Sequence, residues 1–280
     1  MNTIAVVGGT GRVGSHLVKY LIAEGIRPRI VTRRDLSDDE QVSYARADYS
    51  DVTSLRHALS GCSRVFLAHG SSPDQVQHEK AVIDAAIATG VRHLVKLSAM
   101  GGPPNAHPWD WHAEIETYLA TAPIGCTVLR PATFTDILAV SAPLIRAGTW
   151  GGTAQSGRVN LIAADDVAAV GAHELRTAAD DTQRCLHLTG TRPWSMPEIA
   201  DVFTTELHHP VTYTHRTAAE QREILLGSGL AAPAAEILLG IDNAYRHNAL
   251  AETTHTVHDV LGRDPVDVPE WIRAHLPAFR

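Results

Sequence analysis

Short apolar runs alternate with longer segments of helical periodicity over the first half of the chain. The apolar runs 4–7, 29–32, 65–68, 94–97 and 127–129 predict strands, and the segments 13–23, 52–59, 74–89 and 109–121 predict helices. Turn-forming residues such as Gly101-Gly102-Pro103-Pro104 separate them. This alternation is typical of a parallel sheet with helices on both faces, so we predict an α/β fold with a doubly wound parallel sheet.

The alternation loosens after Pro131, and helices then dominate. We expect a helix at 135–146, a strand at 159–162, a helix from Asp165, a strand at 186–188, and helices at 196–207, 217–227, 231–248 and 268–276. Ser195 and Glu198 predict a capping box at the start of the helix 196–207. The pattern predicts a first domain over 1–150, with the segment 158–189 returning to its sheet, and a smaller, mainly helical C-terminal substrate lobe over 190–280.

A glycine-rich loop, Gly8-Gly9-Thr10-Gly11-Arg12-Val13-Gly14, follows the first predicted strand. Glycines at this spacing let the backbone turn sharply and approach a pyrophosphate, while the following helix offers its N-terminal N–H groups to the anion. Strand, loop and helix lie within a unit of about 30 residues, as dinucleotide binding requires. We therefore interpret residues 1–150 as a dinucleotide-binding Rossmann domain; the alternative is a turn that only joins a strand to a helix.

The end of the second predicted strand bears on the choice of cofactor. An acidic residue at this position binds the ribose 2′-hydroxyl of NAD, whereas an arginine accommodates the 2′-phosphate of NADP. The chain has Thr32-Arg33-Arg34 here, and Arg12 in the glycine loop can add a third cation. We expect NADPH/NADP as the cofactor; in the alternative, Asp35 binds the ribose and the arginines are only solvated.

Charge and composition exclude several classes of protein. Lys and Arg number 24 against 31 Asp and Glu, a formal net charge of -7, so direct nucleic-acid binding is not expected. Charged or turn-forming residues interrupt every apolar stretch before the roughly 18 residues of a membrane span, and the N-terminus does not resemble a secretory signal. The 3 cysteines form no CxxC pair, which favours reduced thiols and a cytoplasmic location. The sequence leaves open whether the chain forms a homodimer.

Further motifs resemble those of a known family. They are Val95-Lys96-Leu97-Ser98-Ala99-Met100-Gly101, Leu129-Arg130-Pro131-Ala132-Thr133-Phe134, Asp165-Asp166-Val167-Ala168, Leu188-Thr189-Gly190 and Gly262-Arg263-Asp264-Pro265. In order and spacing, and together with the glycine loop, they resemble the NmrA-like group of atypical short-chain dehydrogenases/reductases over nearly the whole chain. That group contains NADPH-dependent quinone reductases and non-catalytic NADP-sensing regulators.

The resemblance implies a set of cofactor-binding residues. Those implied for the pyrophosphate are Gly8, Thr10, Gly11, Arg12, Val13 and Gly14. Those implied for the rest of the cofactor are Arg33 at the 2′-phosphate, Asp48 at the adenine, Ala68, His69 and Gly70 along the ribose, and Pro131, Thr133 and Phe134 beside the nicotinamide.

The usual catalytic pair of short-chain dehydrogenases, a Tyr followed four residues later by a Lys, is absent from the sequence. Placing Glu116 at the acidic position that follows this pair in extended members puts His112 at the Lys position and Pro108 at the Tyr position. His112 has an unperturbed pKa near 6.5 and can move protons at neutral pH, with Asp110 and Glu116 near in sequence to orient it. In the alternative, His112 only hydrogen-bonds the cofactor or the substrate, and water supplies the proton.

Ser98, at the end of a strand, is a candidate donor to a substrate oxygen, with a cap or a cofactor contact as the alternative. Trp109 and Trp111 can wall a flat aromatic substrate or belong to the core. No metal site is expected from the histidine spacing.

Together these features predict an NADPH-dependent oxidoreductase. We expect hydride transfer to a quinone, an enone or an aromatic or polyketide-like ketone without the Tyr-Lys relay. A quinone needs the least from protein acids. The alternatives are an NAD(P)-sensing regulator without turnover and an epimerase or lyase that uses NAD transiently.

Overall fold

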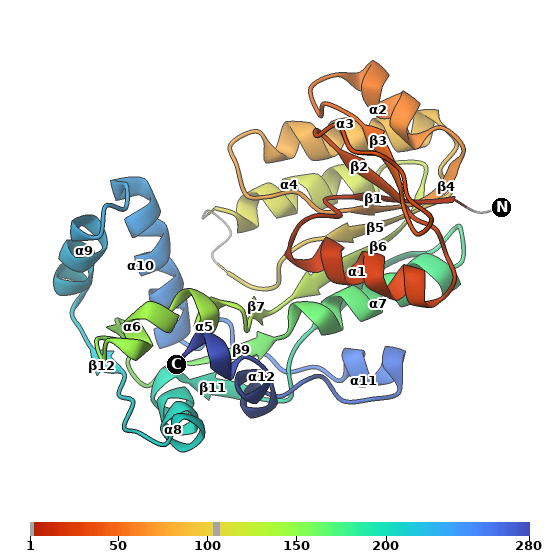
Figure 1. Ribbon diagram of the computed structural model, residues 1–280. Coiled ribbons are helices and arrows are strands. Elements are labelled where there is room, and N and C mark those ends of the chain that lie inside the picture. The colour runs from red at the N-terminus through yellow and green to blue at the C-terminus, as the bar shows by residue number, and fades with distance from the viewer. Residues whose placement is uncertain (1–2, 103–106) are drawn as a thin grey trace.

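The computed structural model, which describes residues 3–102 and 107–280, has a seven-stranded sheet at its centre (Figure 1). Its strands are β1 (Thr3–Val7), β2 (Arg29–Thr32), β3 (Ser43–Arg46), β4 (Cys62–Leu67), β5 (His93–Leu97), β6 (Gly125–Pro131) and β10 (Gln183–Leu188). Their order is β10-β6-β5-β4-β1-β2-β3, and every neighbouring pair is parallel. The predicted doubly wound parallel sheet is confirmed.

Helices cover both faces of this sheet, which explains why its inner strands are runs of apolar residues. The helices α1 (Arg12–Ala23) and α7 (Ala164–Thr177) lie on one face, and α2 (Val52–Leu59), α3 (Gln75–Ala88) and α4 (Trp109–Ala120) lie on the other (Figure 1). Leu17 and Phe66 are buried in the core of the first face, and Leu55 and Ile83 in that of the second. The sheet therefore lies between two apolar layers.

The C-terminal half forms a smaller, mainly helical lobe, whose elements begin at Thr133 and so include residues ahead of the start predicted at residue 190. Its helices are α5 (Ile137–Val140), α6 (Ala142–Arg146), α8 (Met196–Leu207), α9 (Ala218–Gly227), α10 (Ala232–Arg246), α11 (Thr256–Leu261) and α12 (Val268–Ala274), followed by a 3₁₀ turn, Leu276–Ala278. Two small sheets complete it: β11 (Pro193–Ser195), β9 (Arg158–Ile162) and β7 (Thr133–Phe134), and β12 (Thr214–His215) with β8 (Gly151–Gly152). A separate apolar core around Trp150, Phe203 and Trp271 stabilises the lobe.

Several local predictions can be compared with this structure. The capping box of α8 is present, with Ser195 and Glu198 bonded reciprocally. The helix predicted at 135–146 is instead two short helices, because Pro143 lacks the N–H that a continuous helix requires. Pro103 and Pro104 of the predicted turn lie outside the described residues.

Within the segment 158–189, the two strands lie in different sheets. Strand β10 pairs with β6 at the edge of the main sheet, whereas β9 pairs with β7 and β11 in the lobe. The domain division at residue 190 stays a prediction. No helix in the described part of the chain is long and apolar enough to cross a membrane.

Candidate cofactor and active site

A cavity of about 920 Å³ opens at the carboxyl ends of β1, β2 and β4. The strand order reverses at β1, which has β2 on one side and β4 on the other. Open α/β sheets bind ligands at this switch point, because the connections from neighbouring strands leave toward opposite faces. The volume is at the upper end of the range for small-molecule sites, so an extended ligand fits.

The glycine loop forms one wall of this cavity and comes very close to its neighbours. A Cβ atom on Gly8, whose φ is +82°, would lie 2.3 Å from the carbonyl oxygen of Ala68. A Cβ atom on Gly14 would lie 2.2 Å from the carbonyl oxygen of Gly8, which also accepts a hydrogen bond of 2.9 Å from the N–H of Gly11. Only glycine fits at positions 8 and 14, and the tight turn leaves the N-terminus of α1 at the cavity.

Two arginines follow β2 at the edge of the cavity. Arg33 and Arg34 both line it and are exposed, whereas Asp35 does not line it. Within residues 3–102 and 107–280, no carboxylate forms an ion pair with either guanidinium. Both charges are therefore available to an anionic group in the cavity.

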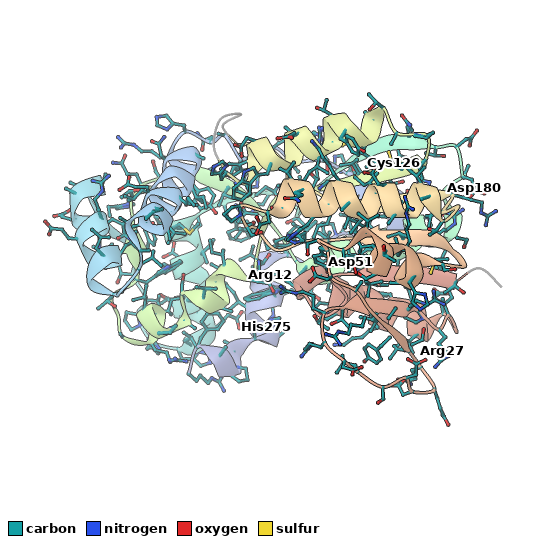
Figure 2. All side chains as sticks on the ribbon, turned by 90° about the horizontal axis from the view of Figure 1, so that it is seen from above. Arg12, Arg27, Asp51, Cys126, Asp180 and His275 are labelled. Carbon is teal, nitrogen blue, oxygen red and sulfur yellow. The ribbon has the colours of Figure 1, made fainter. Side chains whose placement is uncertain are left out.

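The third arginine, Arg12, bridges the two halves of the molecule and lies between them in Figure 2. Its guanidinium carbon is 5.4 Å from the centre of the Phe134 ring, and its Nε is 3.9 Å from a carboxylate oxygen of Asp136. Arg12 and Phe134 both line the cavity. The cavity thus continues from the sheet toward the C-terminal lobe.

Three aromatic rings line the end of the cavity beside Asp48. Tyr49 lies 5.3 Å from His69 and 5.7 Å from His78 between ring centres, and the two histidines are 5.2 Å apart. Hydrogen bonds from the backbone N–H and the hydroxyl of Ser50 lower the pKa of Asp48, and burial lowers that of His69. Tyr49 and His78 were not predicted as site residues, because they are far apart in the sequence and only the fold brings their rings together.

The residues implied beside the ribose and nicotinamide lie at different depths. Ala68 and Gly70 line the cavity with His69, and Phe134 lines it from β7. Pro131 pairs with Leu188 at the end of β6, away from the cavity lining. Thr133 accepts a hydrogen bond of 3.5 Å from the hydroxyl of Tyr245 in the lobe.

His112 lies on α4 against a buried lysine and, like Ser98, is not among the residues that line the cavity. Its Nδ1 is 3.1 Å from Nζ of Lys96, a residue of β5, and 3.4 Å from the amide nitrogen of Gln75. Burial and the positive charge of Lys96 lower the pKa of His112 to about 3. His112 is therefore neutral at physiological pH, unlike the freely titrating histidine that its type alone suggests.

Lys96, which contacts His112, and its partner Glu79 were not predicted as site residues. Nζ of Lys96 forms an ion pair of 3.0 Å with Glu79 of α3, and both side chains are fully buried. The signal was present, since Lys96 interrupts the apolar run of β5. The partner on another helix could not be identified without the fold.

Ser98 belongs to a different network. The Ser98 hydroxyl donates to Glu116, which also forms an ion pair with Arg130 of β6, and Ser98 is 4% exposed. The hydroxyl hydrogen of Ser98 is therefore held by Glu116. Asp110 accepts from Nδ1 of His107 at 2.8 Å. Asp110 and Glu116, the two carboxylates expected to orient His112, thus contact other residues.

The two tryptophans of α4 pack on different neighbours. Trp111 stacks on His107 with ring centres 4.1 Å apart. Trp109 packs against the core of the lobe and closely covers Gly102. Among the described residues, no group of three or more His, Cys, Asp or Glu side chains could hold a metal ion.

Comparison with known proteins agrees with the geometry of the cavity. A protein family described as NAD(P)H-binding matches residues 8–178. The chain is 29% identical over 284 residues to an NAD(P)H azoreductase of Xenophilus azovorans, with 99% of each sequence covered. It is 30% identical over 286 residues to (4-alkanoyl-5-oxo-2,5-dihydrofuran-3-yl)methyl phosphate reductase of Streptomyces griseus, again with 99% of each covered.

A solved structure shares the whole fold. The NADPH-dependent quinone oxidoreductase of Escherichia coli, complexed with NADPH, superposes with a TM-score of 0.88 at 24% identity. The alignment covers 98% of this chain and 99% of that one, so the sheet and the lobe are both shared.

Proposed function

Because this chain belongs to the NAD(P)H-binding family, as its resemblance to the NmrA-like reductases predicted, we propose that it is a reductase that prefers NADPH. It is an NAD(P)H-dependent oxidoreductase, and the proposal concerns its cofactor preference and its substrate. The observation that carries the preference is the pair Arg33 and Arg34, which line the cavity without a carboxylate partner in the described part of the chain. Guanidinium groups bind phosphate through charge-assisted, bidentate hydrogen bonds.

The cavity suits a dinucleotide at each of its parts. The close approach at Gly8 and Gly14 forms the cradle for a pyrophosphate, which the N-terminus of α1 attracts. Arg33 and Arg34 bind the 2′-phosphate, and the rings beside Asp48 offer a flat surface for the adenine. NADPH, when bound, supplies the hydride.

The proposed substrate is a small electron-poor acceptor: a quinone, an enone or an aromatic or polyketide-like ketone. His112 is neutral, so it offers a hydrogen bond to a substrate oxygen and not a readily released proton. Ser98, whose hydroxyl hydrogen is held by Glu116, can only accept from this position, so its proposed role is to anchor α4. A quinone fits this site best, because its reduced oxygens take their protons from water.

The first experiment is calorimetric titration of the purified chain with NADPH, NADP, NADH and NAD. Tight binding of NADPH with weak binding of NADH is the expected result. Comparable affinities for NAD and NADP, with feeble binding of the reduced forms, would instead support a nucleotide sensor without turnover.

The second experiment follows the oxidation of NADPH with a quinone, an enone, an aromatic ketone and an azo dye. The azo dye belongs in the panel because one relative is named an azoreductase. His112→Ala should lower turnover of the accepted substrate more than it lowers NADPH affinity. If His112→Ala instead lowers NADPH affinity and leaves turnover per bound cofactor unchanged, His112 contributes to cofactor binding and not to turnover.

A further inference from the structure

A fully buried ion pair lies behind the proposed donor. Glu79 from α3 and Lys96 from β5 are 3.0 Å apart, and neither side chain is exposed. Desolvation of two charges is expensive, so such a pair is weak evidence of a contribution to stability and often has another role. Its neighbour here is His112, on the third element of the cluster.

The hydrogen bonds of Lys96 determine which nitrogen of His112 carries a hydrogen. An ammonium group donates three hydrogen bonds and accepts none. Its Nζ donates to the carbonyl oxygen of Leu97 at 3.0 Å and lies 3.1 Å from Nδ1 of His112, whereas its contact of 3.0 Å with Oε2 of Glu79 is an ion pair without hydrogen-bond geometry. The amide nitrogen of Gln75, which also donates to Glu79, faces the same Nδ1 at 3.4 Å. Since both neighbours of Nδ1 are donors, this nitrogen presents its lone pair and the hydrogen is on Nε2.

We propose that Lys96 and Glu79 are positioning residues that keep His112 neutral with its hydrogen on Nε2, so that it acts as a fixed hydrogen-bond donor to the substrate. This inference rests on the proposed function for its catalytic meaning. Glu79 forms the ion pair with Lys96 inside the protein, and the ammonium group of Lys96, a donor only, excludes both a proton on Nδ1 and the opposite tautomer.

Charged groups on the packed elements do not offer His112 a counter-charge. The recorded contacts of the ionisable groups around α4 are Lys80 of α3 with Glu114, Asp84 of α3 with Tyr118, Arg130 of β6 with Glu116, and Asp110 with His107. Burial of the ring lowers the pKa of His112 most, and the positive charge of Lys96 lowers it further.

The chemistry balances without a proton from His112. With a reduced nicotinamide nucleotide as the hydride donor, addition to a carbonyl carbon would move the π electron pair to the oxygen, where the N–H of His112 would stabilise the developing negative charge. The oxygen takes its proton from water, and His112 leaves the step with its own hydrogen still on Nε2. Lys96 and Glu79 keep their charges throughout.

The test is a long-range ¹⁵N NMR spectrum of the full chain without cofactor, which distinguishes the two tautomers and the charged ring of each histidine. The signal of His112 is identified by its loss in His112→Asn. We expect a hydrogen on Nε2 and no titration between about pH 5 and 8, the range in which ordinary histidines change charge. Titration in that range, or a hydrogen on Nδ1, would overturn the proposal.

The double variant Lys96→Met with Glu79→Gln removes both buried charges together and so leaves neither one unpaired. The pKa of His112 should then rise by at least about one pH unit, the effect of a unit charge at this distance even when screened as in water. The matched control is Lys80→Met with Glu114→Gln, an ion pair of 2.7 Å that joins α3 to α4, the helix of His112. It should leave His112 unchanged.

An unchanged His112 signal in the first double variant would overturn the inference. Because the spectra need neither cofactor nor substrate, a failure to find turnover would count against the proposed function alone. With an accepted substrate, kcat of the first double variant should vary with pH around the raised pKa of His112. At the same pH values, kcat of the unaltered chain should be constant.

Discussion

Replacement of Arg33 by alanine should weaken the binding of NADPH much more than that of NADH. Arg33 lines the cavity directly after β2, is exposed, and has no carboxylate partner among the described residues. Its removal therefore breaks no ion pair within the protein. Beside its electrostatic effect on Asp48, which lines the same cavity, the change in affinity should report its contact with the ligand.

The magnitude follows from the kind of contact. Hydrogen bonds to charged groups contribute roughly 1.5–3 kcal/mol, which corresponds to about 10-fold to 150-fold in affinity. Arg33 is exposed to solvent, and salt screens exposed charges over a distance of about 8 Å at physiological ionic strength. We therefore expect about a tenfold loss for NADPH at physiological salt, a larger loss at low salt, and less than about a twofold change for NADH, which lacks the 2′-phosphate.

The assay is calorimetric titration of both nucleotides at two salt concentrations, with Arg46→Ala as the matched control. Arg46 pairs with Thr32 at the end of β3, is exposed and does not line the cavity. Each variant removes one positive charge from a chain of formal net charge -7, so a general effect of charge would appear in both. An equal loss of NADPH and NADH in Arg33→Ala would refute the assignment of Arg33 to the 2′-phosphate, as would the same loss in both variants.

Three further predictions concern binding, pH and folding. Gly14→Ala should abolish calorimetric NADPH binding because its Cβ would lie 2.2 Å from a carbonyl oxygen, whereas Gly240→Ala, with no atom within 4 Å of its Cβ, should bind normally. Against the effect of burial, cap hydrogen bonds and an arginine lower the pKa of Glu198 from 4.5 to about 2, so its stabilisation is present above pH 4.5 and is lost as the pH falls toward 2. Glu198→Gln should therefore lower the urea midpoint more at about pH 6 than at about pH 3. Lys96→Met alone should lower the free energy of unfolding in urea by roughly 3–5 kcal/mol, and much less when combined with Glu79→Gln, because the single change leaves a buried charge unpaired.

The main sheet could be predicted where its strands are buried on both faces. Strands β1 and β5 are apolar runs, and the glycine loop marks the end of the first. Strand β3 was not predicted, because Ser43–Arg46 lies at the edge of the sheet and contains polar, partly exposed residues. Its place becomes clear only once β2 is present to pair with it.

The candidate site could be predicted in part for a similar reason. Residues directly after β1, β2 and β4 meet at one edge of the sheet, so Gly8, Arg33 and His69 could be placed together from their positions alone. The neutral state of His112 could not be predicted, because it depends on how deeply the ring is buried and on a lysine 16 residues away in the sequence. The pKa of a side chain depends on the residues packed around it, and these residues are often far apart in the sequence.

The position of β10 determines where the chain can be cut. The family match ends at residue 178, whereas β10 begins at Gln183 and covers the edge of β6 with a six-residue ladder. A recombinant fragment ending at the family boundary would expose the unpaired N–H and C=O groups of β6, which is a template for aggregation. An expression fragment that contains the whole sheet therefore needs the chain at least to Leu188. Even that fragment would lack α11, which packs on α7 and β10.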